Sequence, residues 1–279
     1  MTPLRRRMIE DLRLRGYAAA TQENYVLAVS LLARHYGRSP DLLTPEEIRA
    51  WILYRIGCGL SADTVNQNLC AIKFFFERTL GRDWEVWGLP LQKRSSRLPT
   101  VLSHAEVHEF LGLLPAAMTR GLAWTMYETG ARLFEALALR PGDVDGERLV
   151  LRICRGKGDR ERHVPLAAAT LERLRSLWRS HRSRDWLFPG RRPGRPLTND
   201  AVQKAFGRVR AVSGFPKRVT PHTLRHSYAT HLLERGVNIR VVQQMLGHKN
   251  VRATLRYLHV TDVSHDSVRA AVEGMVAAR

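Results

Sequence analysis

Several features that define common protein classes are scarce or missing in this sequence of 279 residues. The three cysteines, Cys58, Cys70 and Cys154, are far apart and form no C-x-x-C pair, so neither a disulfide framework nor a zinc knuckle is supported. This cysteine usage favours a reducing compartment, and we expect a cytoplasmic protein. No apolar run approaches a bilayer span and no basic segment precedes an apolar one at the start, so we expect no membrane partner.

Acidic residues are also in short supply. Lys and Arg number 45 against 26 Asp and Glu, a formal net charge of +19 that is spread along the chain. Such an excess indicates a polyanionic partner, for which nucleic acid is the leading candidate. No cluster of carboxylates suits a pair of divalent metals, so we expect no metal or other cofactor. A hydrophobic fraction of 44% supports buried cores.

Apolar periodicity and capping signals predict an all-helical first part. Helices are expected over 3–15, 21–36, 48–56 and 61–80, the third starting from a capping box at Thr44. The basic, Pro-punctuated stretch 89–100 is a predicted linker between domains at 1–88 and 101–279. Polar residues of the fourth helix, the linker and a later basic loop are tentative DNA contacts. They are Asn66, Lys73, Lys93, Arg94 and Arg192. Alternatively, the first part is a plain helical bundle whose polar faces contact only solvent.

The second part mixes helices with one small hairpin. Alternating residues over 148–154 and 162–166 predict two strands joined by the tight turn Gly156-Lys157-Gly158-Asp159. Later helices are expected over 167–181, 199–212, 221–235, 237–246, 251–259 and 264–278. The predicted fold is mainly α with a small antiparallel β-sheet.

The stretch from Pro221 to His231 carries the first chemical signal. Pro221 suits a first helical turn, and residues three apart share a helix face, so His222 and Arg225 can aim at one point. The planar guanidinium matches two phosphate oxygens and the imidazole exchanges a proton near neutral pH. A phosphate is therefore the first ligand to consider, although a solvated surface helix would show the same pair.

Six scattered side chains together suit metal-free attack on a phosphodiester. Two arginines can hold the non-bridging oxygens, a tyrosine can attack phosphorus, and a lysine can protonate the leaving 5′ oxygen. The candidates are Arg132, Lys157, His222, Arg225, His248 and Tyr257. Taken singly, Tyr257 is more often a packing residue and Lys157 a solvated hairpin lysine. His222 and His226 do not form a zinc motif because no Glu follows His222, and His226 and His231 are expected to be structural.

The order of these motifs resembles the tyrosine recombinases, the phage integrase or Xer-like family. The motifs are T-G-A-R-L-F-E over 129–135, G-K-G over 156–158, H-T-L-R-H-S-Y-A-T-H over 222–231, L-G-H over 246–248, and Tyr257. The resemblance covers nearly the whole chain and implies a helical SAM-like core-binding domain followed by a catalytic domain. It also implies site-specific recombination of double-stranded DNA through a 3′-phosphotyrosine and a Holliday junction, by a tetramer acting on two sites.

The resemblance assigns a role to each candidate. Tyr257 is the nucleophile, Arg132 and Arg225 bind the scissile phosphate, and Lys157 is the general acid. His222 is the expected base, His248 donates to the phosphate, and Glu135 supports the site from behind. Phe134 departs from the family pattern, which has a small residue there, and this puts the placement of Arg132 in question.

Alternative functions remain open at this point. A type IB topoisomerase-like enzyme would use the same residues to relax DNA as a monomer, and a DNA-binding regulator would carry the site as a remnant. The sequence does not distinguish a mobile-element integrase from a chromosome resolvase, although we favour the former. It also does not reveal the target site, or whether the helix expected over 264–278 docks on its own subunit or a neighbour.

Overall fold

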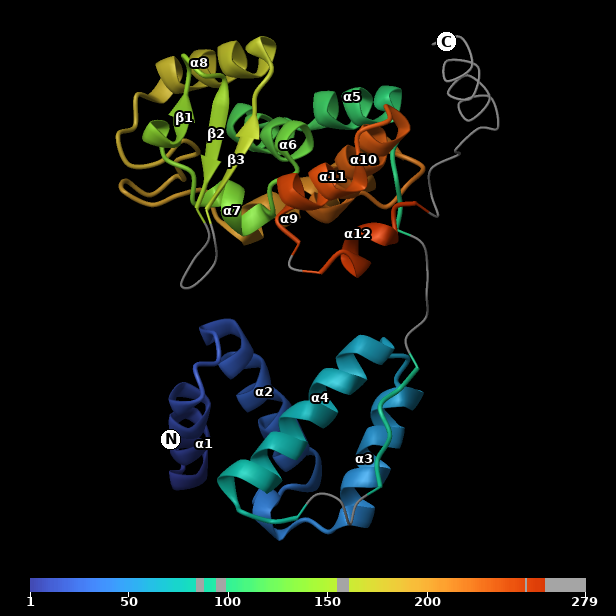
Figure 1. The fold of residues 1–279 in the computed structure, drawn as a ribbon. Helices are drawn as coiled ribbons and strands as arrows, with labels where there is room; N and C mark the ends of the chain where they lie inside the picture. Colours follow the sequence, from blue (N-terminus) through green and yellow to red (C-terminus); the bar gives the residue numbers. More distant parts are fainter. Residues whose placement is uncertain (84–87, 94–98, 155–160, 249, 259–279) are drawn as a thin grey trace. The chain divides into compact units, whose positions relative to one another are not determined.

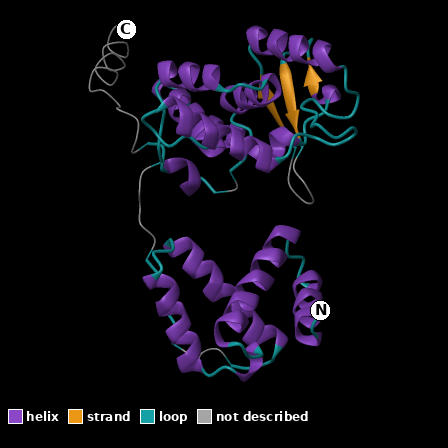
Figure 2. Ribbon diagram, turned by 180° about the vertical axis from the view of Figure 1, so that it is seen from behind, coloured by secondary structure: helices purple, strands orange, loops and turns teal. Residues whose placement is uncertain are grey.

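The computed structural model describes the chain except for residues 84–87, 94–98, 155–160, 249 and 259–279 (Figure 1). It divides into two compact units, Met1–Arg97 and Leu98–Arg279, and the division falls within the stretch 89–100. Helices dominate both units, and the second contains a small antiparallel sheet (Figure 2), so the predicted fold class is confirmed. No helix in the described ranges is long and apolar enough to cross a membrane. The predictions for Arg94, Lys157 and the helix over 264–278 lie outside the described residues.

In its described residues, the first unit has four α-helices that begin and end at recognisable signals. They are α1 (Pro3–Leu14), α2 (Ala19–Tyr36), α3 (Pro45–Gly57) and α4 (Ala62–Phe74). The predicted capping box is confirmed: Thr44 Oγ1 accepts from the Glu47 N–H, and the Glu47 carboxylate accepts from the Thr44 N–H at 2.9 Å. Gly37, in the left-handed region at φ 60°, ends α2.

The fourth helix differs from its predicted course at its C-terminal end. It was expected to run to Leu80, but the α-helix ends at Phe74 and a wider π-turn (Phe75–Thr79) follows. Successive residues of an α-helix point about 100° apart, which would direct one of three adjacent phenylalanines outward. The π-turn instead lets Phe74, Phe75 and Phe76 all be buried in the core of this unit.

Asn66, a tentative DNA contact in the sequence analysis, is turned inward in the structure. Its side chain is buried in the first unit, and both ends of the amide bond the backbone of Gln92. The Asn66 Nδ2 donates to the Gln92 carbonyl at 2.9 Å, and the Gln92 N–H donates to Asn66 Oδ1 at 2.7 Å. The amide is thus used to fasten the segment that leaves this unit, because buried polar groups need hydrogen-bond partners.

The second unit surrounds a core shared by helices and the sheet. Its helices are α5 (His104–Leu113), α6 (Ala117–Thr129), α7 (Leu133–Leu137), α8 (Ala168–His181), α9 (Asn199–Ser213), α10 (Pro221–Glu234), α11 (Ile239–Leu246) and α12 (Arg252–Leu255). α10 packs along α6, and α11 packs against the strand β3 (Arg162–Pro165) (Figure 1). This packing brings the start of α7, the centre of α10 and the end of α11 together.

The sheet has three strands rather than the predicted two. β1 (Val144–Asp145) pairs with β2 (Val150–Ile153), which pairs with β3, all antiparallel. β2 is shorter than the expected 148–154 because Leu149 has φ 53°, outside the strand region. The register sets Leu151 opposite Val164, and both side chains are buried.

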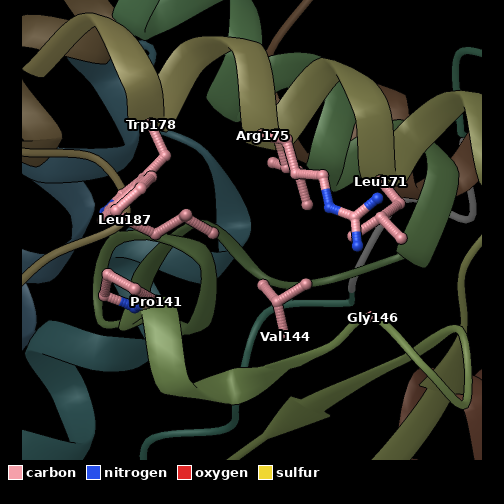
Figure 3. A pocket seen from close by; sticks show the side chains of 8 residues that line it. Pro141, Val144, Gly146, Leu171, Arg175, Trp178 and Leu187 are labelled. Carbon is pink, nitrogen blue, oxygen red and sulfur yellow. The ribbon is translucent and has the colours of Figure 1, made fainter. Parts of the chain in front are cut away.

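An apolar groove runs between α8 and β1 (Figure 3). Leu171 and Leu174 form its buried wall on α8, and Trp178 stands at the more exposed end of the groove. None of the five candidate residues that the structure describes lines this groove, so it is separate from the site that they form.

Candidate active site

The start of α10 holds two of the predicted site residues. Thr220 caps the helix by accepting from the Thr223 N–H at 3.3 Å, and Pro221 occupies the first turn, as predicted. His222 is exposed, whereas Arg225, on the same side one turn later, is only 3% exposed. Arg225 Nη1 donates to the Gly130 carbonyl and Nη2 donates to the Leu246 carbonyl at 2.6 Å. Arg225 is therefore fixed before any ligand binds.

Arg132 lies immediately before α7 and is held by Glu135. The Glu135 carboxylate accepts from the Arg132 backbone N–H at 2.8 Å and from Arg132 Nη1 at 2.8 Å. Arg132 Nη2 also reaches the Gly247 carbonyl at 3.4 Å. Phe134 does not disturb this arrangement, because its ring is 71% exposed and turned away from the core.

A third arginine, Arg162 on β3, completes the cluster and was missed by sequence reasoning. Its buried side chain makes two hydrogen bonds to the Glu135 carboxylate, at 3.0 and 2.6 Å, and Nε donates to the Met245 carbonyl at 2.8 Å. Its position in the strand could have identified it. Arg162 and Val164 share the inward face of the strand, and an arginine on a buried face needs a buried partner.

Arg132 and Arg162 both bond the Glu135 carboxylate, whose charge also acts on Arg225. Burial would raise the pKa of Glu135, but the hydrogen bonds and charge of Arg162, followed by those of Arg132, lower it to about 2. Burial and the charge of Arg132 lower the pKa of Arg225 to about 9. The arrangement is cationic around neutral pH, which suits a bound anion.

Tyr257 follows the short helix α12 and is 2% exposed. The predicted helix over 251–259 is wrong beyond Leu255: the Tyr257 N–H bonds the Thr254 carbonyl at 3.0 Å, three residues back, in a tight turn. The Tyr257 hydroxyl is hydrogen-bonded to Nδ1 of His226 at 2.9 Å. Burial raises the pKa of Tyr257, while the positive charges of Arg225, Arg256 and Arg132 oppose that rise.

His226 therefore has a closer relation to the site than the structural role expected for it. Burial, then the neighbouring His222, Arg256 and Arg225, lower its pKa to about 4, so its ring is neutral near pH 7. Burial and the charges of Arg225 and Arg132 likewise lower the pKa of His222. A neutral imidazole beside the Tyr257 hydroxyl can accept its proton.

His248 follows Gly247, whose left-handed conformation at φ 61° ends α11. His248 Nδ1 is hydrogen-bonded to Thr254 Oγ1 at 2.8 Å, and its ring lies nearly parallel to that of Tyr257, with centroids 6.4 Å apart. The bond to Thr254 fixes the orientation of the ring through Nδ1.

The described part of the site thus brings together five of the six candidates and Glu135, whereas Lys157 lies outside the described residues. Among the tentative DNA contacts, Lys93 and Arg192 are exposed, and Lys73 is half exposed with its Nζ 3.5 Å from Glu77 Oε1. No group of three or more metal-ligating side chains occurs in the ranges that the structure describes. Fixed guanidiniums beside imidazoles and a phenol are suited to stabilise charge on a phosphodiester while the phenol attacks it.

The chain is similar to known proteins over most of its length. Residues 100–263 match the model of the phage integrase family, and residues 4–86 match that of the phage integrase N-terminal SAM-like domain. A putative integrase/recombinase of Sinorhizobium fredii is 44% identical over 93% of this chain and 85% of its own length. A tyrosine recombinase XerC of Corynebacterium efficiens is 33% identical over 80% and 76%. The fold is similar to that of a lambda integrase dimer bound to a core site, with a TM-score of 0.74, 20% identity and coverage of 89% and 92%.

Proposed function

The chain belongs to the phage integrase family of tyrosine recombinases, and on that premise we propose that Tyr257 cuts DNA by forming a 3′-phosphotyrosyl bond. The protein is an enzyme of site-specific recombination that breaks and rejoins DNA. The observation that carries the residue assignment is the convergence of Arg132 and Arg225 on adjacent carbonyls at the end of α11, beside Tyr257.

The proposed reaction is a transfer between two oxygens. The Tyr257 hydroxyl oxygen bonds to phosphorus while the bond from phosphorus to the 5′ oxygen breaks. Arg132 and Arg225 bind the non-bridging oxygens, and His222 and His248 donate hydrogen bonds to the phosphate. The phenolic proton passes to an imidazole of α10, and Lys157, by family resemblance, supplies the proton taken up by the leaving 5′ oxygen.

We further propose the setting of this reaction. Double-stranded DNA is the partner, bound through phosphate contacts that include Lys73, Lys93, Arg94 and Arg192. Four copies act on two DNA sites through a Holliday junction, in integration or excision of a mobile element or, alternatively, in chromosome resolution. The high positive charge supports the DNA partner, and the family resemblance supports the tetramer.

The decisive experiment traps the covalent intermediate. Nicked duplexes derived from the DNA that flanks the gene are incubated with the protein, denatured, and separated by size. We expect a protein–DNA adduct with the native chain and none with Tyr257→Phe, which keeps the ring but removes the nucleophilic oxygen. Absence of an adduct on every duplex would favour a DNA-binding regulator, and relaxed circles without recombinant product would favour a topoisomerase.

A further inference from the structure

Three consecutive carbonyls at the end of α11 each accept a hydrogen bond from a different arginine. The Met245 carbonyl accepts from Arg162 Nε at 2.8 Å, and the Leu246 carbonyl from Arg225 Nη2 at 2.6 Å. The Gly247 carbonyl accepts from Arg132 Nη2 at 3.4 Å. The three donors come from β3, α10 and the start of α7, so the end of one helix joins three separate elements.

The way α11 ends leaves these carbonyls available. The last carbonyls of a helix have no intrahelical donor and carry partial negative charge, which favours cations. Here the N–H groups of Gly247 and His248 bond the carbonyls of Gln244 and Gln243, at 2.9 and 3.1 Å. The N–H groups that end the helix therefore bond carbonyls of its preceding turn. The next three carbonyls, those of residues 245–247, accept hydrogen bonds from the arginines instead.

Arg162 differs from Arg132 because it is turned away from solvent. Its side chain is 8% exposed and that of Glu135 is 9% exposed, whereas the side chain of Arg132 is 35% exposed. Arg162 donates hydrogen bonds from Nη1 and Nη2 to the two carboxylate oxygens of Glu135. Its Nε donates to the Met245 carbonyl on α11. Arg162 thus holds the carboxylate that holds Arg132.

We propose that Arg162 is a positioning residue for strand cleavage: it locks Glu135 against the end of α11, so that Arg132 presents its guanidinium to the scissile phosphate without rearranging. This inference rests on the function proposed above. Two parallel hydrogen bonds fix the plane of a carboxylate more firmly than one. A misplacement of about 1 Å in a group that stabilises a transition state can cost on the order of 100-fold in rate.

The competing explanation is an ordinary buried ion pair that contributes only to folding. Removal of one partner of a buried pair leaves an uncompensated charge and destabilises the fold. Such a role would lower the melting temperature but would leave the cleavage rate of the folded protein unchanged. The effect of Arg162 on the rate, and its dependence on Glu135, separates the two explanations.

The test compares single-turnover adduct formation at saturating DNA for the full chain and for Arg162→Met, Arg162→Lys, Glu135→Gln and the double variant Arg162→Met with Glu135→Gln. We expect Arg162→Met to slow cleavage by about 10- to 100-fold while DNA affinity stays within about twofold. Arg162→Lys should be intermediate, because an amine lacks the fork that contacts Glu135 and Met245 together. The double variant should be no slower than Glu135→Gln, because Arg162 acts through Glu135.

A matched control lies in the same unit. Arg173 makes two hydrogen bonds from one nitrogen to the Glu128 carboxylate, at 2.7 and 2.8 Å, away from the end of α11. Arg173→Met should lower stability and leave the cleavage rate at the native level.

A native cleavage rate for Arg162→Met would overturn the inference, and Arg162→Lys replaces it in this comparison if the Met variant does not fold. The inference would also be overturned if the loss of rate in the double variant equalled the product of the losses in Arg162→Met and Glu135→Gln. A native chain that forms no adduct would overturn the proposed function itself.

Discussion

The hydroxyl of Tyr257 lies 2.9 Å from Nδ1 of His226, one helical turn beyond His222 on α10. The phenol is buried and its pKa is raised, so it keeps its proton near neutral pH and needs an acceptor in order to attack. The ring of His226, whose pKa is about 4, is neutral under the same conditions. This geometry supports His226 as a candidate proton acceptor, beside His222, to which the family resemblance assigns that role.

Replacement of His226 by Asn tests this assignment. An Asn amide can accept a hydrogen bond near the position of Nδ1 but cannot take up a proton, so we expect adduct formation to slow by about 100-fold. His231→Asn is the matched control, since His231 is on the same helix and is hydrogen-bonded to the hydroxyl of Tyr127 at 2.9 Å. A His226→Asn variant that cleaves at the native rate would exclude proton transfer to this ring.

Gly130, which ends α6, is expected to tolerate no side chain. Its φ is 63°, and a Cβ at this position would lie 2.5 Å from Tyr228 Cδ1 and 3.0 Å from Leu246 Cδ2. Gly130→Ala should destabilise the second unit by roughly 3 kcal/mol through backbone strain and overlap together. Gly214→Ala has the same sign of φ, at 66°, with open space around it, and should cost roughly 1 kcal/mol. Thermal or urea unfolding of both variants measures the difference, and equal losses would show that the overlap is relieved.

Phe134 should be dispensable for stability despite its size. Its ring is 71% exposed, and Arg132 beside it is held by Glu135 rather than by packing. Phe134→Ser should change the free energy of unfolding by less than about 0.5 kcal/mol. Phe110→Ala, at a position only 1% exposed, should cost about 3–5 kcal/mol in the same measurement. A large loss for Phe134→Ser would mean that its ring is covered in solution.

Acid should weaken the fold in a pH window set by two buried histidines. The pKa of His231 is lowered to about 4 by burial and then by His104, and that of His226 is also about 4. Because the unfolded chain binds these protons from about pH 6.5, stability is complete above that value and is lost as pH falls toward 4. His231→Asn should make the decline between pH 7 and 4 shallower by roughly 1–3 kcal/mol. Parallel unfolding curves for the native chain and the variant would contradict this linkage.

The sequence predicts the parts of this molecule that depend on local signals. The capping box at Thr44 and the Pro221 turn set helix starts that the structure reproduces. Apolar periodicity predicted the four helices that the first unit contains in its described residues. The strand β1 was not predicted, because its two residues are too few to show an alternation of apolar and polar side chains.

The contacts that sequence reasoning missed join residues far apart in the chain. Arg162 lies 27 positions from Glu135 and 83 from Met245, and His226 lies 31 from Tyr257. Asn66 is polar and helical, as a DNA contact would be, but its partner Gln92 is 26 residues away. Local patterns identify which residue types are present, whereas the packing of helices and strands decides which of them meet.

The carbonyls of Met245, Leu246 and Gly247 give the site a support that point mutation cannot easily remove. A backbone oxygen is present whatever side chain is attached, so substitutions at 245 and 246 are constrained only by the core into which those side chains pack. At these two positions the support leaves no residue-specific trace for selection to preserve, whereas the φ of 61° at Gly247 favours glycine. Chains that have diverged widely at these positions can therefore still hold their arginines in the same way.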